Sequence, residues 1–451
     1  MDSQADTSTD TIYALSSGAG LAGVSVVRVS GAYADALLAS LGVSPLPEAR
    51  YAALHKLRSD GDGPVIDQAL VLRFPAPGSF TGEDVAELHV HGGRAVLAAV
   101  FDAISATGLV RHAEPGEFTR RAFENGKLDL TAAEGLADLV AAQTDAQRRL
   151  ALRQYDGVLA DLYEGWRARL IDLMGYAEAE IDFSDEELPE GLKAATEARI
   201  AVLNAEITQH IVGEKQGEYI RSGFPIILLG APNVGKSSIL NYLAKRDVAI
   251  VSEVAGTTRD VIEIHLNLGG FSVTLSDTAG MREASNAIEA EGVRRAEQCA
   301  QDAALRLVVL DATYGTLPDK VRALINDECI VVVNKADLLN GKYAAPELPD
   351  GIVPILVSAE TGDGLEDLLV RLTGHIRDRL EASEAPLPTR QRHRDALAEA
   401  NAALANVADA AYPELAAEDV RVALRALGRV TGRVDIDEIL DTVFRDFCIG
   451  K

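Results

Sequence analysis

The spacing of hydrophobic and polar positions changes several times along the chain, and these changes divide it into segments. From residue 11 to about 121, short strand-like and helix-like stretches alternate, with Gly and Pro between them. From residue 128 to about 221, turn residues become rare and Ala, Leu, Glu and Arg dominate, with Leu136, Leu139 and Val140 spaced for one helical face. The first segment is therefore predicted to be a small α/β domain and the second a helical domain.

A second α/β pattern begins at Phe224, where strand-like runs alternate with helical ones up to about residue 377. This order is typical of a mostly parallel sheet covered by helices. The chain then becomes helical again from residue 397 to 447. Two helical stretches around an α/β segment indicate a domain inserted into a helical one, because inserted domains enter and leave through ends that lie close together. The predicted division is 1–121, N-terminal α/β; 122–220, helical, first part; 221–377, inserted α/β; and 378–451, helical, second part.

Composition and charge narrow the class of protein. The 451 residues suffice for about three domains of ordinary size, and 47% are hydrophobic and 25% charged, as in soluble globular proteins. No apolar stretch is long enough to span a bilayer, and the opening segment lacks the features of an export signal. The three cysteines are too few and too scattered for a disulfide framework, which favours a reducing cytoplasm. A net charge of −26 would repel a polyanion, so nucleic acid would need a local basic patch or a partner.

A phosphate-binding loop follows the apolar run Phe224–Leu229, which suits a buried parallel strand. The loop reads Gly230-Ala231-Pro232-Asn233-Val234-Gly235-Lys236-Ser237, and its predicted nucleotide contacts are Asn233, Val234, Gly235, Lys236, Ser237 and Ser238. Its glycines let the backbone curl so that amide N–H groups and the following helix N-terminus face the phosphates. Lys236 supplies a cation for catalysis, and the Ser237 hydroxyl is offered to Mg²⁺. A chance Gly-rich turn is the alternative, which the strand-to-helix context disfavours.

Two further short motifs, called boxes here, are predicted to contact the phosphates and the base. Asp277, Thr278, Ala279 and Gly280 follow the strand-like run 271–275, which places Asp277 near the metal and the Gly280 amide near the γ-phosphate. Asn334, Lys335 and Asp337 follow the strand-like run 329–333. A carboxylate there can accept from both the ring N–H and the exocyclic amine of guanine, a pair of donors that adenine lacks. The predicted base is therefore guanine.

The remaining parts of a GTPase can also be located. Ser358, Ala359 and Glu360 end the strand-like run 353–357, where a backbone amide would meet the guanine carbonyl. The polar loop 252–260 carries two threonines, of which Thr258 is the predicted switch threonine on Mg²⁺. Met281 occupies the position where small regulatory GTPases have a water-orienting glutamine, so hydrolysis needs another group. The downstream acids Glu283, Glu289 and Glu291 are candidates, although each could be an ordinary solvated helix charge.

Residues outside these boxes resemble the tRNA-modification GTPases of the MnmE (TrmE) family over essentially the whole chain. The resemblance is carried by 23–31 (GVSVVRVSG), 79–84 (SFTGED), 91–93 (HGG), 115–119 (PGEFT), 121–123 (RAF), 127–130 (KLDL), 181–183 (IDF) and 447–451 (FCIGK). One departure is the stretch from Ser16 to Gly20, which replaces a more Pro/Arg-rich family segment. The resemblance implies a multidomain α/β and α fold, with a folate-binding-like N-terminal α/β domain that dimerises, a discontinuous helical domain and an inserted P-loop GTPase domain.

The resemblance also implies chemistry and partners. A homodimer would act with the flavoprotein MnmG (GidA), in a heterotetramer or larger complex, to place an aminomethyl or carboxymethylaminomethyl group on C5 of the wobble uridine of certain tRNAs. The one-carbon unit would come from methylenetetrahydrofolate. By motif, Arg28, Glu87, Lys127 and Lys451 would contact the folate (5-formyl or methylene), and Cys448 would be the catalytic cysteine. From its apolar neighbours alone, Cys448 could equally be a small buried hydrophobe.

The same resemblance implies how hydrolysis proceeds without the water-orienting glutamine that Met281 replaces. The GTPase domains would dimerise across the nucleotide when K⁺ binds, and K⁺ would provide positive charge where an arginine finger otherwise stands. The implied K⁺ ligands are Asn233, Ser252, Val254 and Thr257, of which Ser252 and Thr257 also belong to the nucleotide site. Glu289 matches the family's acidic residue that positions water and is the implied catalytic acid.

Several alternatives stay open at this stage. His89 and His91 alternate along a strand and could be metal ligands, although no third ligand is apparent. A basic cluster could meet tRNA phosphates or be a solvated helix face; its members are Arg148, Arg149, Arg153, Arg390, Arg392, His393 and Arg394. A regulatory or ribosome-assembly GTPase without one-carbon chemistry is the second function considered. A folate enzyme with a vestigial GTPase conflicts with the intact Lys236, Ser237, Asp277 and Asp337.

Overall fold

The computed structural model describes most of the chain and confirms a multidomain α/β and α fold. The described residues are 10–18, 20–182, 192–245, 262–277, 303–313, 322, 325–326, 328–339, 348, 352–381, 385–407, 410, 412–434, 440, 443–444, 447 and 450. Contacts between Cα atoms group the chain into two units, Met1–Ala137 with Arg425–Lys451, and Asp138–Leu424. This grouping is coarser than the four-part division predicted from the sequence and does not test its boundaries.

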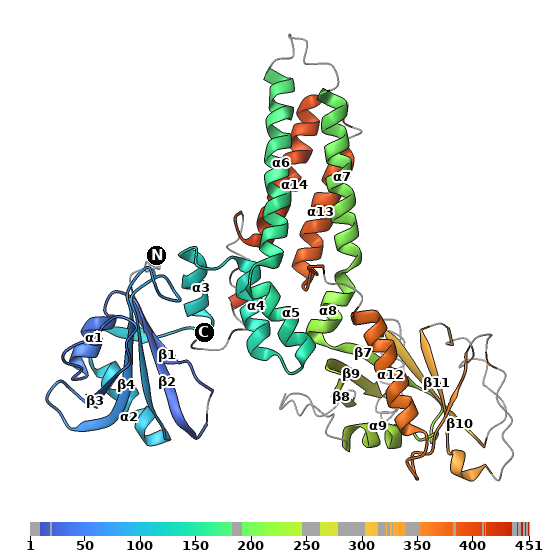
Figure 1. Cartoon of the computed structure of the whole chain (residues 1–451), viewed down its shortest axis with the longest axis horizontal. Helices are drawn as coiled ribbons and strands as arrows, with labels where there is room; N and C mark the ends of the chain where they lie inside the picture. The colour runs from blue at the N-terminus through green and yellow to red at the C-terminus, as the bar shows by residue number, and fades with distance from the viewer. Residues whose placement is uncertain are drawn as a thin grey trace, which may run out of the picture. The chain divides into compact units, whose positions relative to one another are not determined.

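The first unit contains a six-stranded sheet in the order β3-β4-β5-β2-β1-β6 (Figure 1). Its strands are β1 (Thr11–Leu15), β2 (Ala22–Ser30), β3 (Ala53–Arg58), β4 (Val65–Phe74), β5 (Val85–Gly92) and β6 (Val110–His112). Neighbouring strands are antiparallel, except that β1 and β6 are parallel. Successive side chains of a strand point to opposite faces, so each strand contributes to two different environments.

One face of this sheet carries the core of the first unit. Val27 and Val29 of β2 are fully buried there, in one cluster with residues of α1 (Ala34–Ser40) and α2 (Arg94–Ala106). On β1, Ile12 instead packs with Phe118 of α3 (Glu117–Glu124), in a separate small cluster. Arg28 lies between the two valines and therefore points to the face opposite the main core.

The end of the chain belongs to the same unit as its beginning. Leu130 of α4 (Leu130–Ala141) packs with Phe444 and Phe447. Gly116 has φ 70°, and a Cβ there would lie 2.6 Å from the carbonyl oxygen of Phe444, so this approach requires glycine. The C-terminal residues thus complete the apolar core beneath α3 and α4.

The helices of the second unit that lie before and after its sheet in the sequence form a bundle (Figure 1). They are α5 (Asp145–Tyr155), α6 (Val158–Asp182), α7 (Leu192–Val212), α8 (Glu214–Ser222), α13 (Gln391–Val407) and the first part of α14 (Pro413–Thr431). The start of α5 is fixed by a capping box between Thr144 and Gln147, which satisfies N–H groups that the first helical turn leaves without partners. Leu203 of α7 and Leu397 of α13 are fully buried where these helices pack.

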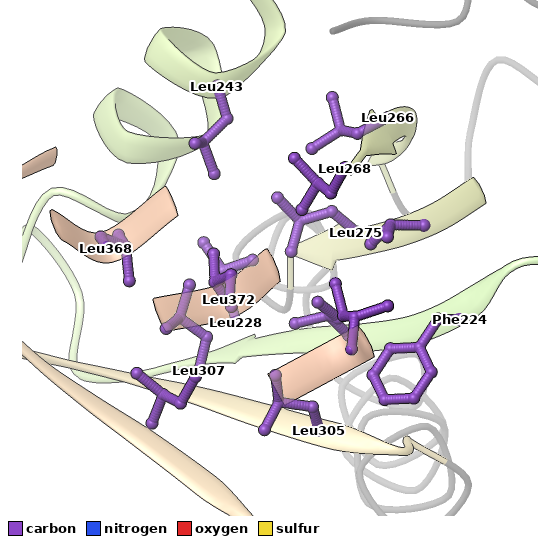
Figure 2. Close-up of a cluster of buried hydrophobic side chains, with 14 of the residues drawn as sticks. Phe224, Leu228, Leu243, Leu266, Leu268, Leu275, Leu305, Leu307, Leu368 and Leu372 are labelled. Carbon is purple, nitrogen blue, oxygen red and sulfur yellow. The ribbon is translucent and has the colours of Figure 1, made fainter. Parts of the chain in front are cut away.

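The second sheet has the order β12-β11-β10-β7-β9-β8 and confirms the predicted mostly parallel sheet. Its strands are β7 (Phe224–Leu229), β8 (Ile262–Leu268), β9 (Phe271–Asp277), β10 (Leu305–Asp311), β11 (Cys329–Asn334) and β12 (Ile355–Leu356). Only the pair β8–β9 is antiparallel. Figure 2 shows the leucines that pack between strands β7 and β10 and the helices α9 (Lys236–Lys245) and α12 (Leu365–Leu380). No helix in the described ranges combines the length and the apolar character that crossing a membrane requires.

Candidate functional site

The loop between β7 and α9 has the backbone shape that phosphate binding needs. Gly230 has φ 153°, and a Cβ there would lie 2.3 Å from the carbonyl oxygen of Val309. Gly235 has φ 97°, and its Cβ would lie 2.1 Å from the Asn334 side chain. Lys236 is buried, and its Nζ donates to the carbonyl oxygens of Gly230 and Ala231, at 3.0 and 3.1 Å. The lysine therefore folds back over its own loop and holds the loop closed.

Asn334, at the end of β11, joins the phosphate loop to the loop after β12. Its Nδ2 donates to the carbonyl oxygen of Val234 at 2.8 Å, and its Oδ1 accepts from the Ala359 N–H at 3.0 Å. The side chain is 2% exposed, so both hydrogen bonds are shielded from water. Asn334 thus fixes two loops that the sequence predicted as separate boxes.

The loop after β11 is held by two further polar contacts. The hydroxyl of Ser358, which is fully buried, donates to Asp337 Oδ1 at 2.6 Å. Lys335 has φ 66°, and its Nζ pairs with Asp311 Oδ2 at 2.6 Å. Burial alone would raise the pKa of Asp311, but hydrogen bonds from Lys335 and Thr313 outweigh it and lower that pKa. The sequence interpretation missed Asp311, although its place at the end of an apolar strand was a usable signal.

The predicted nucleotide residues in the described ranges gather at one edge of the second sheet. Strands β7, β9, β10, β11 and β12 all end there, because they run parallel, and this is the edge at which open α/β sheets bind ligands. The backbone of Asp277 is in register with Leu228 of β7, next to the phosphate loop. Ser237 and Asn233 are exposed at the same loop. The predicted residues outside the described ranges are Ser252, Val254, Thr257, Thr258, Thr278, Ala279, Gly280, Glu289, Cys448 and Lys451.

In the first unit, Arg28 and Glu87 form a cross-strand ion pair. They are opposite each other in the register of β2 and β5, and Arg28 Nε and Nη2 donate to Glu87 Oε1 at 3.0 and 2.9 Å. The guanidinium carbon of Arg28 lies 5.5 Å from the ring centre of Phe80 and 5.9 Å from that of Phe118. The pair is half-buried, with a charged group presented between aromatic rings.

Lys127 borders the same loop that carries Phe80. Its Nζ donates to the carbonyl oxygen of Pro77 at 2.9 Å, and its stem lies against Gly82. The structure thus places Arg28 and Lys127 at two points of the loop 77–82.

A buried ionic network that the sequence interpretation missed holds the end of this loop. Arg121 donates to Glu83 at 3.1 Å and to Glu117 Oε1 at 2.9 Å, and the Ser30 hydroxyl donates to Glu83 Oε2 at 2.6 Å. Arg111 also donates to Glu117. These residues lie within or beside the segments that carry the family resemblance, but their spacing in the sequence did not predict which of them form ion pairs.

The C-terminal segment reaches the first sheet beside the Arg28 strand. The Ser16 hydroxyl donates to the carbonyl oxygen of Gly450 at 2.8 Å. Gly450 has φ 102°, and a Cβ there would lie 2.1 Å from the carbonyl oxygen of Leu15, so only glycine fits. Leu15 is paired with Val27, one residue from Arg28.

The basic cluster and the two histidines lie next to carboxylates. Arg148 and Arg149 each pair with Asp145, Arg390 pairs with Asp138 at 2.8 Å, and Arg394 pairs with Glu218 at 2.7 Å. Exposed ion pairs of this kind are weak, so binding of tRNA phosphates by this cluster stays a prediction. His89 contacts Glu87 and His91 contacts Asp67, and no three His, Cys, Asp or Glu side chains in the described part of the chain are grouped to hold a metal ion.

Two family models match the chain. The MnmE helical domain matches residues 130–448, and the N-terminus of the GTP-binding protein TrmE matches residues 11–127. The chain belongs to the MnmE (TrmE) family. Relatives described as tRNA modification GTPase MnmE include that of Paramagnetospirillum magneticum, which is 53% identical over 98% of this chain and 100% of its own length. Another, from Rhodospirillum rubrum, is 51% identical over 98% of this chain and 99% of its own.

Two solved structures that resemble part of this chain are isolated G domains of FeoB proteins. The G domain of the T. maritima FeoB iron transporter is 23% identical, with 34% of this chain and 97% of that chain covered and a TM-score of 0.25. That score is too low to support an assignment. The MnmE assignment rests on the family models and on the full-length relatives.

Proposed function

We propose that this chain binds and hydrolyses GTP and that hydrolysis is coupled to tRNA modification. The observation that carries the proposal is the Asn334 side chain, which ties the phosphate loop to the loop after β12 through two buried hydrogen bonds. Asp337 stands three residues after Asn334, where its carboxylate can accept the two N–H donors of guanine. Asn334 would therefore connect the loop that binds the triphosphate to the loops that select the base.

The phosphate loop fits a triphosphate by its own geometry. Gly230 and Gly235 have positive φ and no Cβ, so the backbone can curl at these two positions and its amide N–H groups can face phosphate oxygens. Lys236 holds its ammonium at the loop and would exchange carbonyl contacts for phosphate oxygens. Ser237 and Thr258 would hold Mg²⁺, with Asp277 near it, and the ion would neutralise the charge that develops on the phosphates. Asn233 would contribute to a K⁺ site with Ser252, Val254 and Thr257, and Glu289 would position water.

The first unit supplies the second part of the proposal. Arg28, paired with Glu87, lies beside Phe80 of the loop 77–82, and Lys127 contacts Pro77 of the same loop; together they would offer charges and an aromatic ring to a reduced folate. We propose methylenetetrahydrofolate as the one-carbon source, Lys451 as a further contact, and Cys448 as the catalytic thiol. A homodimer would work with the MnmG flavoprotein on the wobble uridine of tRNA in the cytoplasm. The four-part domain division is part of this proposal.

The nucleotide proposal is tested by base specificity. Purified chain should hydrolyse GTP and not ATP in the presence of Mg²⁺, and faster with K⁺ than with Na⁺. Asp337→Asn should lose GTP and gain xanthosine triphosphate, because the Asn amide can donate to the carbonyl of xanthine where the Asp carboxylate cannot. Its Oδ1 still accepts from Ser358, so the loop should keep its fold. Equal use of ATP and GTP by the unaltered chain would end the proposal.

The tRNA part is tested in cells that lack the protein, by mass spectrometry of wobble nucleosides. Loss of the C5 substituent, restored by the unaltered gene, is expected. Retention of the substituent would favour a regulatory GTPase without one-carbon chemistry.

A further inference from the structure

Strand β9 runs from the nucleotide site toward helix α5. It ends at Asp277, which is predicted to lie near the metal ion, and it begins at Phe271, directly after Gly270 in the turn that follows β8. Its seven residues span roughly 20 Å. Because the strand is hydrogen-bonded on both sides, to β7 and to β8, it is a stiff connection between these two ends.

The turn at Gly270 is joined to the first turn of α5. The Ala146 N–H donates to the carbonyl oxygen of Gly270 at 3.1 Å. An N–H group in the first turn of a helix has no partner within its own helix, and here another segment supplies the acceptor. The Ala146 side chain is 6% exposed and belongs to the same hydrophobic cluster as Leu268 and Phe271, on either side of the turn. Hydrogen bonding and apolar packing therefore both connect the turn to α5.

The next residue, Gln147, ties the start of α5 to the point where the chain enters the second sheet. Its Oε1 accepts from the N–H groups of Gln143 and Thr144, at 3.0 and 3.1 Å, and its Nε2 donates to the carbonyl oxygen of Arg221 at 2.9 Å. Arg221 Nε donates in turn to the carbonyl oxygen of Thr389 at 2.9 Å. Arg221 lies just before β7 and Thr389 just before α13, so the chain leaves the bundle and returns to it beside the start of α5.

Helix α5 leads into α6, which carries the only tryptophan of the chain. Two residues separate Tyr155, at the end of α5, from Val158, at the start of α6, so a change in the direction of α5 reaches α6 through a short connection. Trp166 of α6 is 4% exposed, its Nε1 donates to Glu206 of α7 at 3.1 Å, and its ring centre lies 5.3 Å from that of His210. The fluorescence of Trp166 therefore reports on the packing of α6 against α7.

We propose that the nucleotide state passes to the helical bundle through β9, the Gly270 turn and the first turn of α5, and that Gln147 is the residue that couples them. This inference rests on the proposed binding of GTP and adds the route by which the bundle responds. The Ala146 contact transmits a movement of the turn to α5. The Gln147 contact keeps the start of α5 seated against Arg221, so that the movement changes the direction of the whole helix.

Gln147→Glu breaks this coupling with a nearly isosteric change. Glutamate keeps an oxygen that accepts from the N–H groups of Gln143 and Thr144, and a capping box accepts Glu as well as Gln. It replaces the Nε2 donor by an oxygen, which cannot donate to the carbonyl of Arg221. Gln147→Asn is a second variant without added charge, because its shorter amide does not reach that carbonyl. Gln143→Glu, at an exposed side chain, is the matched control.

The experiment follows Trp166 emission of the full chain during titration with a non-hydrolysable GTP analogue, in the presence of Mg²⁺ and K⁺. Titration calorimetry measures binding of the same analogue, and thermal unfolding verifies folding. The analogue should change the emission of the unaltered chain and of Gln143→Glu equally. Gln147→Glu and Gln147→Asn should bind the analogue with unchanged affinity and lose most of the change in emission.

The outcomes separate the route from the function on which it rests. If the unaltered chain does not bind the analogue, the proposed GTP function is wrong. If it binds without a change in Trp166 emission, GTP binding stands and the route to the bundle is refuted. A full change in emission in folded Gln147→Glu or Gln147→Asn would also refute the route. An equal loss in Gln143→Glu would do the same, because added charge rather than the Arg221 contact would then be responsible.

Discussion

In the nucleotide site the predicted contact residues stand at the ends of parallel strands or in the loops after them, whereas Arg28 and Glu87 stand within two antiparallel strands. In the first arrangement, residues from several loops lie at one edge of a sheet, and Asn334 connects two of these loops by hydrogen bonds. The second depends on register, since a slip of one residue between β2 and β5 would send the two side chains to opposite faces. We therefore expect the site whose residues lie in loops (the loop site) to tolerate a change in strand register better than the site whose residues lie within strands (the strand site).

The two arrangements also differ in what fixes a charge. Lys236 is held by carbonyl oxygens of its own loop, which cost little to release when phosphate arrives. Arg28 is held by a full opposite charge, so its guanidinium is available only together with Glu87. Lys236 can therefore exchange its partners more readily than Arg28 can.

The sharpest test of the loop site is Lys236→Ala. It removes the cation at the phosphates, and GTP hydrolysis should fall about a thousandfold. Steady-state hydrolysis with Mg²⁺ and K⁺ measures this. Lys245→Ala, in the last turn of the same helix, serves as the control and should keep full activity. A loss of less than tenfold in Lys236→Ala would contradict the assigned role.

The part played by Asn334 is tested by Asn334→Ala. The change leaves the Val234 carbonyl and the Ala359 N–H without their buried partner, which costs on the order of 3 kcal/mol. GTP should bind roughly a hundredfold more weakly, as read by titration of a fluorescent GTP analogue. Asn241→Ala, on the exposed side of α9, is the matched control. Unchanged affinity would mean that the two loops are fixed in some other way.

The strand site is tested by Arg28→Ala, which leaves the half-buried Glu87 carboxylate without its main partner. Binding of 5-formyltetrahydrofolate should weaken roughly thirtyfold. GTP hydrolysis should keep its rate, because Arg28 lies in the other unit. Arg94→Ala, at the exposed start of α2, should leave both measurements unchanged. A parallel loss of GTP hydrolysis would show that the two sites are not separate in the way described.

A smaller effect is expected for the ionic network behind the strand site. Burial alone would raise the pKa of Glu117, but hydrogen bonds from Arg111, the Glu114 N–H and Arg121 together lower it from its ordinary value. The carboxylate therefore stabilises the fold above its ordinary pKa of 4.5, and this stability is lost as the pH falls through the lowered value. Glu117→Gln should cost about 1 kcal/mol at pH 7 and reduce the loss of stability in acid.

Urea unfolding at several pH values measures the Glu117→Gln effect. Glu124→Gln, in an exposed pair with Arg120 on the same helix, is the control and should change little. An unchanged acid dependence in Glu117→Gln would mean that the network does not couple to folding.

The sequence was informative where contiguous residues share a task. The phosphate loop and the Asn334–Asp337 box were located from adjacent residues, because a loop at a strand end is one short segment. The alternation of strand-like and helix-like runs also predicted the mostly parallel sheet correctly. The family resemblance named Arg28 and Glu87 as folate contacts but predicted no pairing between them, since 59 residues separate the two in the sequence.

The sequence alone did not predict contacts between segments that are far apart in the chain. Asn334 and Val234 are 100 residues apart, and nothing in either box reveals the hydrogen bond between them. The same holds for Arg121 with Glu83, and for His89, whose residue type suggested a metal ligand rather than a partner of Glu87. Register and side-chain direction determine these pairs, and a sequence pattern gives neither across a long separation.

The hydrogen bond between Ser16 and Gly450 joins residues 434 positions apart, and it affects the order in which the chain can mature. During synthesis the first sheet is made before the second unit, yet Phe444, Phe447 and Gly450, which pack in the first unit, are made after it. The second unit is therefore fully translated before the first unit can complete its packing.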